Sequence, residues 1–207
     1  KFFTATDDDH ILIDADYSQI ELRLLAHLSE DENMIESFNS GADIHTITAA
    51  KVFRVSPENV TKDLRLRAKA VNFGIIYGMS EYGLAKQLKI SSIEARNFID
   101  AYFKEFPEVR AYMDENVNFA KENGYAVTLL GRKRHIKELS SPNFNLRSFG
   151  ERVAMNMPLQ GSSADIIKLA MLGVNRRLKK ENLKSELILQ VHDELILERL
   201  EFLMIHQ

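Results

Sequence analysis

The stretch HILIDAD, residues 10–16, decides the fold together with the helix that follows it. Its side chains alternate between apolar and polar, which is typical of a half-buried β-strand. From Ser18 to about Ser29 the apolar side chains recur at a helical spacing instead. The strand therefore runs directly into a helix. Asp16 ends the strand, where the chain turns and a side chain can face a cleft.

The end of the chain supplies a second β signal. Residues 187–191 (LILQV) and 195–198 (LILE) flank His192-Asp193-Glu194, and this pattern predicts a hairpin with the triplet at its tip. An early strand and a late hairpin can share one sheet only if the residues between them form an insertion. We therefore expect an α+β fold, with a small antiparallel sheet backed by helices and a mostly helical insertion.

The region between the two β signals reads as a series of helices. Pro158 and Gly161 are expected to separate the last two of them, because proline removes a helical hydrogen bond and glycine weakens a helix. A short hairpin is expected over residues 125–130 and 134–136. The expected helices span residues 43–53, 62–77, 81–88, 94–106, 108–123, 146–156 and 164–180.

Composition limits the class of protein. The 207 residues are 45% apolar and 28% charged, as in globular proteins, and they include no cysteine, which excludes disulfides and thiolate metal sites. No apolar run approaches the roughly 20 residues of a membrane helix, and no signal peptide is recognisable, so we expect a cytoplasmic protein. The net charge of -3 is unusual for a nucleic-acid binder, although local basic clusters matter more than the sum.

Three groups of residues carry chemical signals. The first is DYSQIELR, residues 16–23, which begins with the acid at the strand end. A rigid strand end can hold a carboxylate for Mg²⁺, which needs only one or two such ligands besides water and phosphate oxygens. The second acidic group is the tip Asp193-Glu194, where a tight turn lets both acids reach one site. Either group alone is more often a solvated turn.

The third group is a stripe on the helix predicted over residues 62–77. Arg65, Lys69, Phe73 and Tyr77 recur every four residues, and such a step turns the helix by roughly 400°, so the side chains share one face. The cations favour an anion such as a triphosphate, and the rings offer surfaces on which a base can stack. An amphipathic helix with core aromatics is the alternative. Glycines at positions 74 and 78 suggest a close approach to the backbone.

Together these groups resemble the motifs of the family A DNA polymerases, the bacterial DNA polymerase I group. Residues 16–23 resemble motif A, residues 65–78 (RLRAKAVNFGIIYG) resemble motif B, and His192-Asp193-Glu194 resembles motif C. The resemblance covers nearly the whole chain and fades over about the last ten residues. It implies a palm formed by residues 1–40 and 141–207 and fingers formed by residues 41–140, with the motif B helix at about 62–78.

The resemblance also implies an activity. Asp16 and Asp193 would hold two Mg²⁺ ions, with Glu194 supporting the site, and the reaction would transfer a deoxynucleotide from a dNTP to a primer 3′-hydroxyl with release of pyrophosphate. Lys69 would protonate the leaving pyrophosphate, and Glu21 would act as a steric gate against ribose. We expect a monomer that binds primer-template DNA and dNTP, without a membrane partner, near the bacterial nucleoid.

Further site residues follow from the same resemblance. The implied nucleotide-binding residues are Arg65, Lys69, Phe73, Tyr77, His45, Glu21 and Gln19. The implied DNA-binding residues are Arg152, Asn156, Gln160 and His192. His45 and the residues from 152 to 160 could equally be ordinary parts of their helices.

Some family features are absent from this sequence. The thumb and the exonuclease-like domain that precede the motifs in the family do not occur here, and residues 199–207 are unfamiliar. We therefore expect a piece of a longer polypeptide, with weak or no activity alone. The alternatives are a single-subunit RNA polymerase-like palm and a non-catalytic fragment that binds nucleic acid. Glu21 and the His-Asp-Glu triplet favour the DNA enzyme.

Overall fold

A computed structural model describes residues 4–200 of the chain. The chain forms two compact units. Unit 1 comprises residues 1–20 and 163–207, and unit 2 comprises residues 21–162. Helices and small antiparallel sheets make up the described residues, so the expected α+β class is confirmed. The division into palm and fingers is a functional one and stays a prediction.

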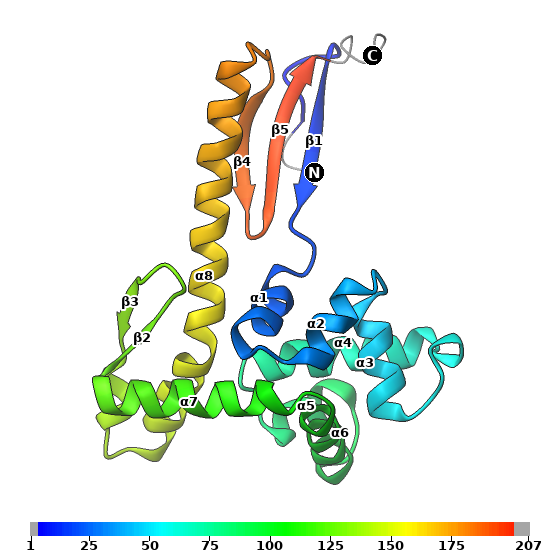
Figure 1. Cartoon of the computed structure of the whole chain (residues 1–207), viewed down its shortest axis with the longest axis vertical. Helices are drawn as coiled ribbons and strands as arrows, with labels where there is room; N and C mark the ends of the chain where they lie inside the picture. Colours follow the sequence, from blue (N-terminus) through cyan, green and yellow to red (C-terminus); the bar gives the residue numbers. More distant parts are fainter. Residues whose placement is uncertain (1–3, 201–207) are drawn as a thin grey trace. The chain divides into compact units, whose positions relative to one another are not determined.

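Unit 1 contains a three-stranded antiparallel sheet. Its strands are β1 (His10–Asp16), β5 (Glu194–Leu200) and β4 (Glu186–Val191), in the order β1-β5-β4. The end of α8 (Phe144–Lys180) runs alongside this sheet (Figure 1). The prediction that the early strand and the late hairpin share one sheet is thus confirmed.

The register of the sheet is continuous over the whole of β1. His10 pairs with Leu200 at one end, and Asp16 pairs with Glu194 at the other. Beyond the first of these pairs, the backbone N–H and the hydroxyl of Thr6 donate to the Glu198 carboxylate at 2.6 and 2.9 Å. Pairing along a full strand leaves little freedom for slippage, so the β1 end stays opposite the hairpin tip.

Unit 2 is mostly helical (Figure 1). Two short strands, β2 (Tyr125–Val127) and β3 (Lys133–His135), form the hairpin that the sequence predicted. Its other elements are α1 (Ile20–Ser29), α2 (Glu32–Asn39), α3 (Ile44–Phe53), η1 (Pro57–Asn59), α4 (Lys62–Ile76), α5 (Glu81–Leu88), α6 (Ser92–Glu105), α7 (Pro107–Asn123), η2 (Lys137–Ser140) and the beginning of α8.

Side-chain caps fix where these helices begin. Asp43, Thr61, Ser80 and Ser91 each accept a hydrogen bond from the backbone N–H three residues later. Asp31, which is 1% exposed, caps two helices at once, because its carboxylate accepts from Met34 N in α2 and from Glu108 N in α7. Helix α2 was not expected from the sequence.

Helix α8 corrects one prediction. The expected break at Pro158 and Gly161 is wrong, and a single helix runs through both residues. Pro158 has no N–H to donate to the carbonyl four residues earlier, yet it is buried within the continuous helix. The Ser162 hydroxyl adds a separate hydrogen bond to the Pro158 carbonyl. A Cβ at Gly161 would lie 2.5 Å from Thr128 Cγ2, so this glycine allows the β2–β3 hairpin to pack closely against the helix.

The core beneath that hairpin joins α7, the hairpin and α8. Its buried members are all apolar, and three of them are alanines, which let the elements approach closely: Val117, Ala120, Ala126, Ile136, Ala154 and Met157. This packing supplies the support that lets α8 continue past its proline.

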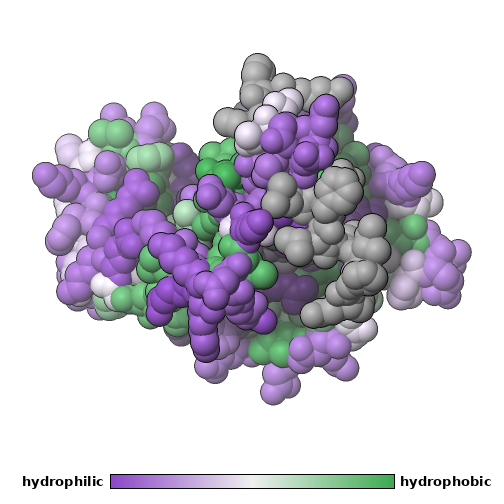
Figure 2. Space-filling view, turned by 90° about the horizontal axis from the view of Figure 1, so that it is seen from above, coloured by the Kyte–Doolittle hydropathy of each residue, from purple (hydrophilic) through white to green (hydrophobic). Residues whose placement is uncertain are grey.

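On the face that Figure 2 shows, hydrophilic residues predominate and hydrophobic residues lie among them. In the part of the chain that the structure describes, no helix combines the length and the apolar character required to cross a membrane.

Candidate active site

The acids predicted to bind metal come together at one end of the sheet in unit 1. Asp16 is the last residue of β1 and is paired with Glu194, the first residue of β5. The next backbone N–H, that of Tyr17, donates to the Asp193 carbonyl at 2.9 Å. Paired residues in antiparallel strands have Cα atoms about 4.5–5.5 Å apart, so the backbone holds the acids of the two segments next to each other.

The backbone around these acids is unusual. Gln19 and His192, which are not glycines, have left-handed conformations with φ of 58° and 51°. Such conformations are uncommon for non-glycine residues and concentrate at functional sites. The Gln190 side-chain amide donates to the His192 carbonyl at 2.6 Å, which holds the hairpin tip in its turn. The tip is therefore a fixed structure.

The donor set fits a hard divalent cation. Asp16 is exposed, and Asp193 and Glu194 are half-buried, so their oxygens remain accessible. Among residues 4–200, no three His, Cys, Asp or Glu side chains are grouped closely enough to form a metal site by themselves. Mg²⁺ usually keeps several water ligands and takes one or two carboxylates together with substrate phosphates, so a site completed by its substrate suits these residues.

The predicted stripe on α4 forms one continuous face in unit 2. The Lys69 Nζ lies 5.8 Å from the centroid of the Phe73 ring, and the Phe73 and Tyr77 rings are stacked with centroids 6.3 Å apart and planes 15° from parallel. Lys69 and Tyr77 are exposed, and Phe73 is half-buried. A cation followed by two stacked rings can contact an anion and a planar group side by side.

Arg65 begins this face and is held by a carboxylate. Its Nε and Nη2 donate to the two Asp43 oxygens at 2.9 Å each. The same carboxylate accepts from the Thr46 N–H and hydroxyl at the start of α3. Partial burial of Asp43 opposes its ionisation, but the hydrogen bonds from Arg65 and Thr46 outweigh that effect and lower its pKa to about 2. Arg65 is thus fixed in place and its charge is balanced.

Lys69 differs from Arg65 in this respect. Among the residues that the structure describes, Lys69 forms no ion pair, and its ammonium group is exposed over the Phe73 ring. An exposed ammonium beside an aromatic face can bind a phosphate without first breaking an internal salt bridge.

His45 lies in α3, beneath the α4 face. It is 3% exposed, its Nδ1 is 2.9 Å from Asn72 Nδ2, and its ring centroid is 5.9 Å from that of Phe73. Burial, reinforced by Arg65 and Lys69 and opposed by Asp43, lowers the pKa of His45. The lowered pKa favours the neutral imidazole.

Glu21 and Tyr77 are joined directly. The Tyr77 hydroxyl donates to Glu21 Oε2 at 3.1 Å, which links α1 to the end of α4. This contact places the carboxylate predicted as a steric gate next to the last ring of the stripe. Gln19, by contrast, belongs to unit 1.

Two of the residues predicted to contact DNA, Arg152 and Asn156 on α8, pack against the end of α4 and the turn that follows it. Asn156 Nδ2 donates to the Ile76 carbonyl at 3.2 Å, and a Cβ at Gly78, whose φ is 61°, would lie 3.0 Å from Arg152 Cγ. The close approach expected at this glycine is thus made by a side chain of the same chain. Arg152 and Gln160 are exposed. Because Asn156 already binds backbone, part of its role is to fix the turn.

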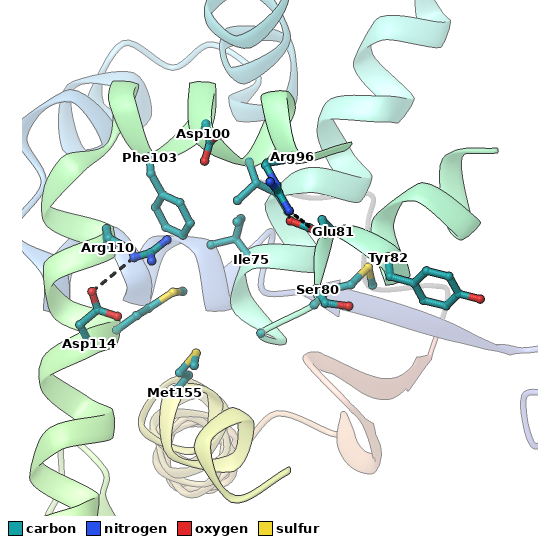
Figure 3. Close-up of a pocket in the computed structure, with 14 residues that line it drawn as sticks. Ile75, Ser80, Glu81, Tyr82, Arg96, Asp100, Phe103, Arg110, Asp114 and Met155 are labelled. Atoms are coloured by element: carbon teal, nitrogen blue, oxygen red, sulfur yellow. Dashed lines mark hydrogen bonds and ion pairs between the residues drawn. The ribbon is translucent and has the colours of Figure 1, made fainter. Parts of the chain in front are cut away.

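A pocket that the sequence did not predict lies next to this turn (Figure 3). It has a volume of about 610 Å³ and is formed by α5, α6, α7 and α8. Both of its arginines are engaged: Arg96 contacts Glu81, and Arg110 binds Asp114 and lies 4.9 Å from the Phe103 ring centroid. None of the predicted site residues lines it.

Sequence reasoning also missed the partners that hold the α4 face. Asp43, Asn72 and Thr48 lie within or beside the segments already singled out, but each contacts a residue distant in the chain. Asp43 carried one usable signal, because an aspartate before a helix is a common N-cap. Nothing local pointed to Asn72 or Thr48.

Two curated proteins are similar in sequence to nearly the whole of this chain. DNA polymerase I of Caldicellulosiruptor bescii is 59% identical over 189 residues, which cover 91% of this chain and 22% of that protein. DNA polymerase I of Geobacillus stearothermophilus is 57% identical over 196 residues, which cover 95% of this chain and 22% of that protein. The chain thus spans about 22% of the length of these curated relatives.

One solved structure is similar in both fold and sequence. It is described as the POL domain of Pol1 from M. smegmatis in complex with DNA primer-template and dNTP. It has a TM-score of 0.90 and 48% identity, and the match covers 95% of this chain and 35% of that one. Residues 1–202 match the model of DNA polymerase family A. With that match over nearly its whole length, the chain belongs to DNA polymerase family A.

Proposed function

We propose that this chain takes part in template-directed DNA synthesis, transferring a deoxynucleoside monophosphate to a primer 3′-hydroxyl and releasing pyrophosphate. The observation that carries the proposal is the pairing of Asp16 with Glu194 beside the Asp193 turn. Membership of the family and the complex described for the M. smegmatis structure support it. Residues 1–40 and 141–207 would form the palm, and residues 41–140 the fingers.

Asp16 and Asp193 are the proposed ligands of two Mg²⁺ ions. Polymerases of this family generally use metal ions. When bound, such ions lower the pKa of the attacking 3′-hydroxyl and stabilise the charge on the leaving oxygen. Glu194, half-buried beside them, would support the site without being a permanent ligand. The paired strands keep the two aspartates in place, so little reorganisation is required when the substrate binds.

The α4 face is the proposed nucleotide-binding surface. Lys69 would bind the triphosphate and donate a proton to the oxygen of the leaving pyrophosphate as the bond to the α-phosphorus breaks. Arg65, already oriented by Asp43, would contact the same anion, with His45 and Gln19 as further contacts. Phe73 and Tyr77 would lie against the sugar and the new base pair. These contacts align the reactants for in-line displacement.

Glu21 is the proposed gate against ribonucleotides. Its carboxylate is tied to the Tyr77 hydroxyl, so it cannot easily swing away from the last ring of the stripe. A ribose 2′-hydroxyl would then meet a fixed carboxylate. This bond supports a DNA polymerase over an RNA polymerase-like enzyme.

Arg152, Asn156, Gln160 and His192 are the proposed contacts to DNA near the primer end. Minor-groove acceptors occur on every base pair, so such contacts can test the shape of a pair without reading its sequence. We further propose that the chain acts on DNA in the bacterial cytoplasm, a proposal supported by its similarity to bacterial DNA polymerase I.

Primer extension tests the proposal. A labelled primer-template with Mg²⁺ and the matching dNTP should gain one template-directed nucleotide at high protein concentration, at a low rate for the chain by itself. The four ribonucleotides should be used far less. Extension that ignores the template base, or no extension even in a polypeptide as long as the relatives, would contradict the proposal. Binding of DNA without extension in that longer polypeptide would favour the non-catalytic alternative.

A further inference from the structure

Three polar side chains form a buried chain beneath the proposed nucleotide-binding face. His45 and Thr48 lie one turn apart on α3, and Asn72 lies opposite them on α4. Their exposed fractions are 3%, 0% and 0%, so solvent does not compete for their hydrogen bonds. Asn72 is the central member, with one end of its amide toward each partner.

With the Asn72 amide oriented as in the structure, the donors and acceptors along this chain define the position of a proton. The Thr48 hydroxyl donates to Asn72 Oδ1 at 3.2 Å, which directs Asn72 Nδ2 toward His45 Nδ1 at 2.9 Å. An amide NH₂ can only donate, so His45 Nδ1 must accept. A neutral imidazole carries one N–H, and it must then be on Nε2.

The surroundings of His45 also influence its protonation, and burial is the largest influence. Asp43 begins its helix, and Arg65 and Lys69 approach from α4. Burial and the two cations disfavour the imidazolium form and lower the pKa of His45, whereas Asp43 alone opposes them. An imidazolium would also direct an N–H against the Asn72 NH₂ group and lose that hydrogen bond. Both the hydrogen-bond geometry and the burial of the ring therefore favour the neutral form.

We propose that Asn72, oriented by Thr48, is a positioning residue that keeps His45 neutral with its proton on Nε2, so that this N–H donates to an oxygen of the bound triphosphate. This role rests on the proposed function. Arg65 and Lys69 already supply positive charge. A neutral donor adds direction to the site without a third fixed cation that would also retain the pyrophosphate product.

Nitrogen NMR of the chain labelled with ¹⁵N-histidine tests the tautomer directly. The chain has six histidines, and the His45 signals are identified by their loss in His45→Gln. We expect an unprotonated Nδ1 and a protonated Nε2 at pH 7. A proton on Nδ1 would mean that the Asn72 amide is turned the other way, and it would overturn the proposal. This measurement does not depend on polymerase activity.

Asn72→Asp reverses the hydrogen bond. A carboxylate can only accept, so His45 Nδ1 should become protonated and the pKa of the ring should rise, while the other five histidines keep their signals. Thr48→Val leaves the amide free to turn and should give a mixture of tautomers. It is the second variant to use if Asn72→Asp does not fold. An unchanged His45 spectrum in a folded variant would overturn the positioning role.

Two further measurements separate this proposal from the proposed function. Addition of dGTP should shift the His45 Nε2 signal in the wild-type chain whether or not primer extension occurs, and no shift would overturn the contact to the triphosphate. In extension assays, Asn72→Asp should raise the KM for dNTP roughly tenfold with a smaller change in kcat. It should also make kcat/KM depend on pH across the new titration of His45. A KM and a pH profile identical to those of the wild type would contradict the role.

Discussion

The acids at the end of the sheet are positioned by backbone pairing, whereas the polar side chains of the α4 face are positioned by other side chains. Asp16 and Glu194 lie opposite each other because two strands pair in register. Arg65 and His45 are oriented by Asp43 and Asn72, which come from neighbouring helices. The backbone pairing at the end of the sheet should stay in place when one of its side chains is replaced. The α4 face should lose its geometry when a partner is replaced.

Removal of one aspartate at the sheet end should have the largest effect. Asp193→Asn should lower the rate of nucleotide insertion by roughly 10³-fold or more, because the amide cannot replace a charged metal ligand. Stability should hardly change, since the backbone positions the residue. Asp14→Asn is the matched control, an exposed acid on β1 away from the end of the strand. Comparable losses in both variants would contradict the assignment.

Replacing the two cations of the α4 face one at a time should give losses of activity of different size. Lys69→Met should lower kcat/KM for dNTP roughly 10²-fold, and Arg65→Met only about tenfold, because Asp43 already balances the charge of Arg65. Steady-state insertion kinetics give both numbers, with Lys62→Met at the start of α4 as the control. A larger loss for Arg65→Met would mean that Asp43 releases the arginine when substrate binds.

Two variants should weaken the discrimination against ribonucleotides by different amounts. Glu21→Ala should lower the preference for dNTP over the matching ribonucleotide by roughly 10–100-fold, because the 2′-hydroxyl no longer meets a carboxylate. Tyr77→Phe keeps the carboxylate but removes its hydrogen bond, so it should have a smaller effect. Competition assays with both sugars measure the ratio. If Glu21→Ala leaves the ratio unchanged, the gate lies elsewhere.

The ion pair between Asp43 and Arg65 should contribute to the free energy of unfolding. Asp43→Asn keeps the helix cap but loses the charge, and should lower the free energy of unfolding by about 1–2 kcal/mol at pH 6. The pKa of Asp43 is lowered to about 2, so its contribution is present above about pH 4 and is lost as pH falls toward 2. Urea unfolding between pH 3 and 6 measures this difference. Asp63→Asn removes the exposed ion pair with Arg67 and should lower the free energy of unfolding by less.

The sequence predicted what depends on local patterns. β1, the β4–β5 hairpin and most helices follow from periodicity. The acids are found because Asp16 ends a strand and Asp193 and Glu194 lie at the hairpin tip. Pro158 misled the prediction because the helix around it is packed against α7 and the β2–β3 hairpin, which no local pattern reveals. The same limit applies to Asn72, whose partners belong to α3 and come near it only when the helices pack.

The shared position of Asp16 and Asp193 is tested most directly by metal-directed cleavage. Fe²⁺ in place of Mg²⁺, with ascorbate and peroxide, cuts a backbone close to the bound ion. We expect cuts near both Asp16 and Asp193, and loss of both cuts in either Asp16→Asn or Asp193→Asn, since paired strands would hold one common site. Cleavage near Asp16 that persists in Asp193→Asn would contradict a site shared by the two acids.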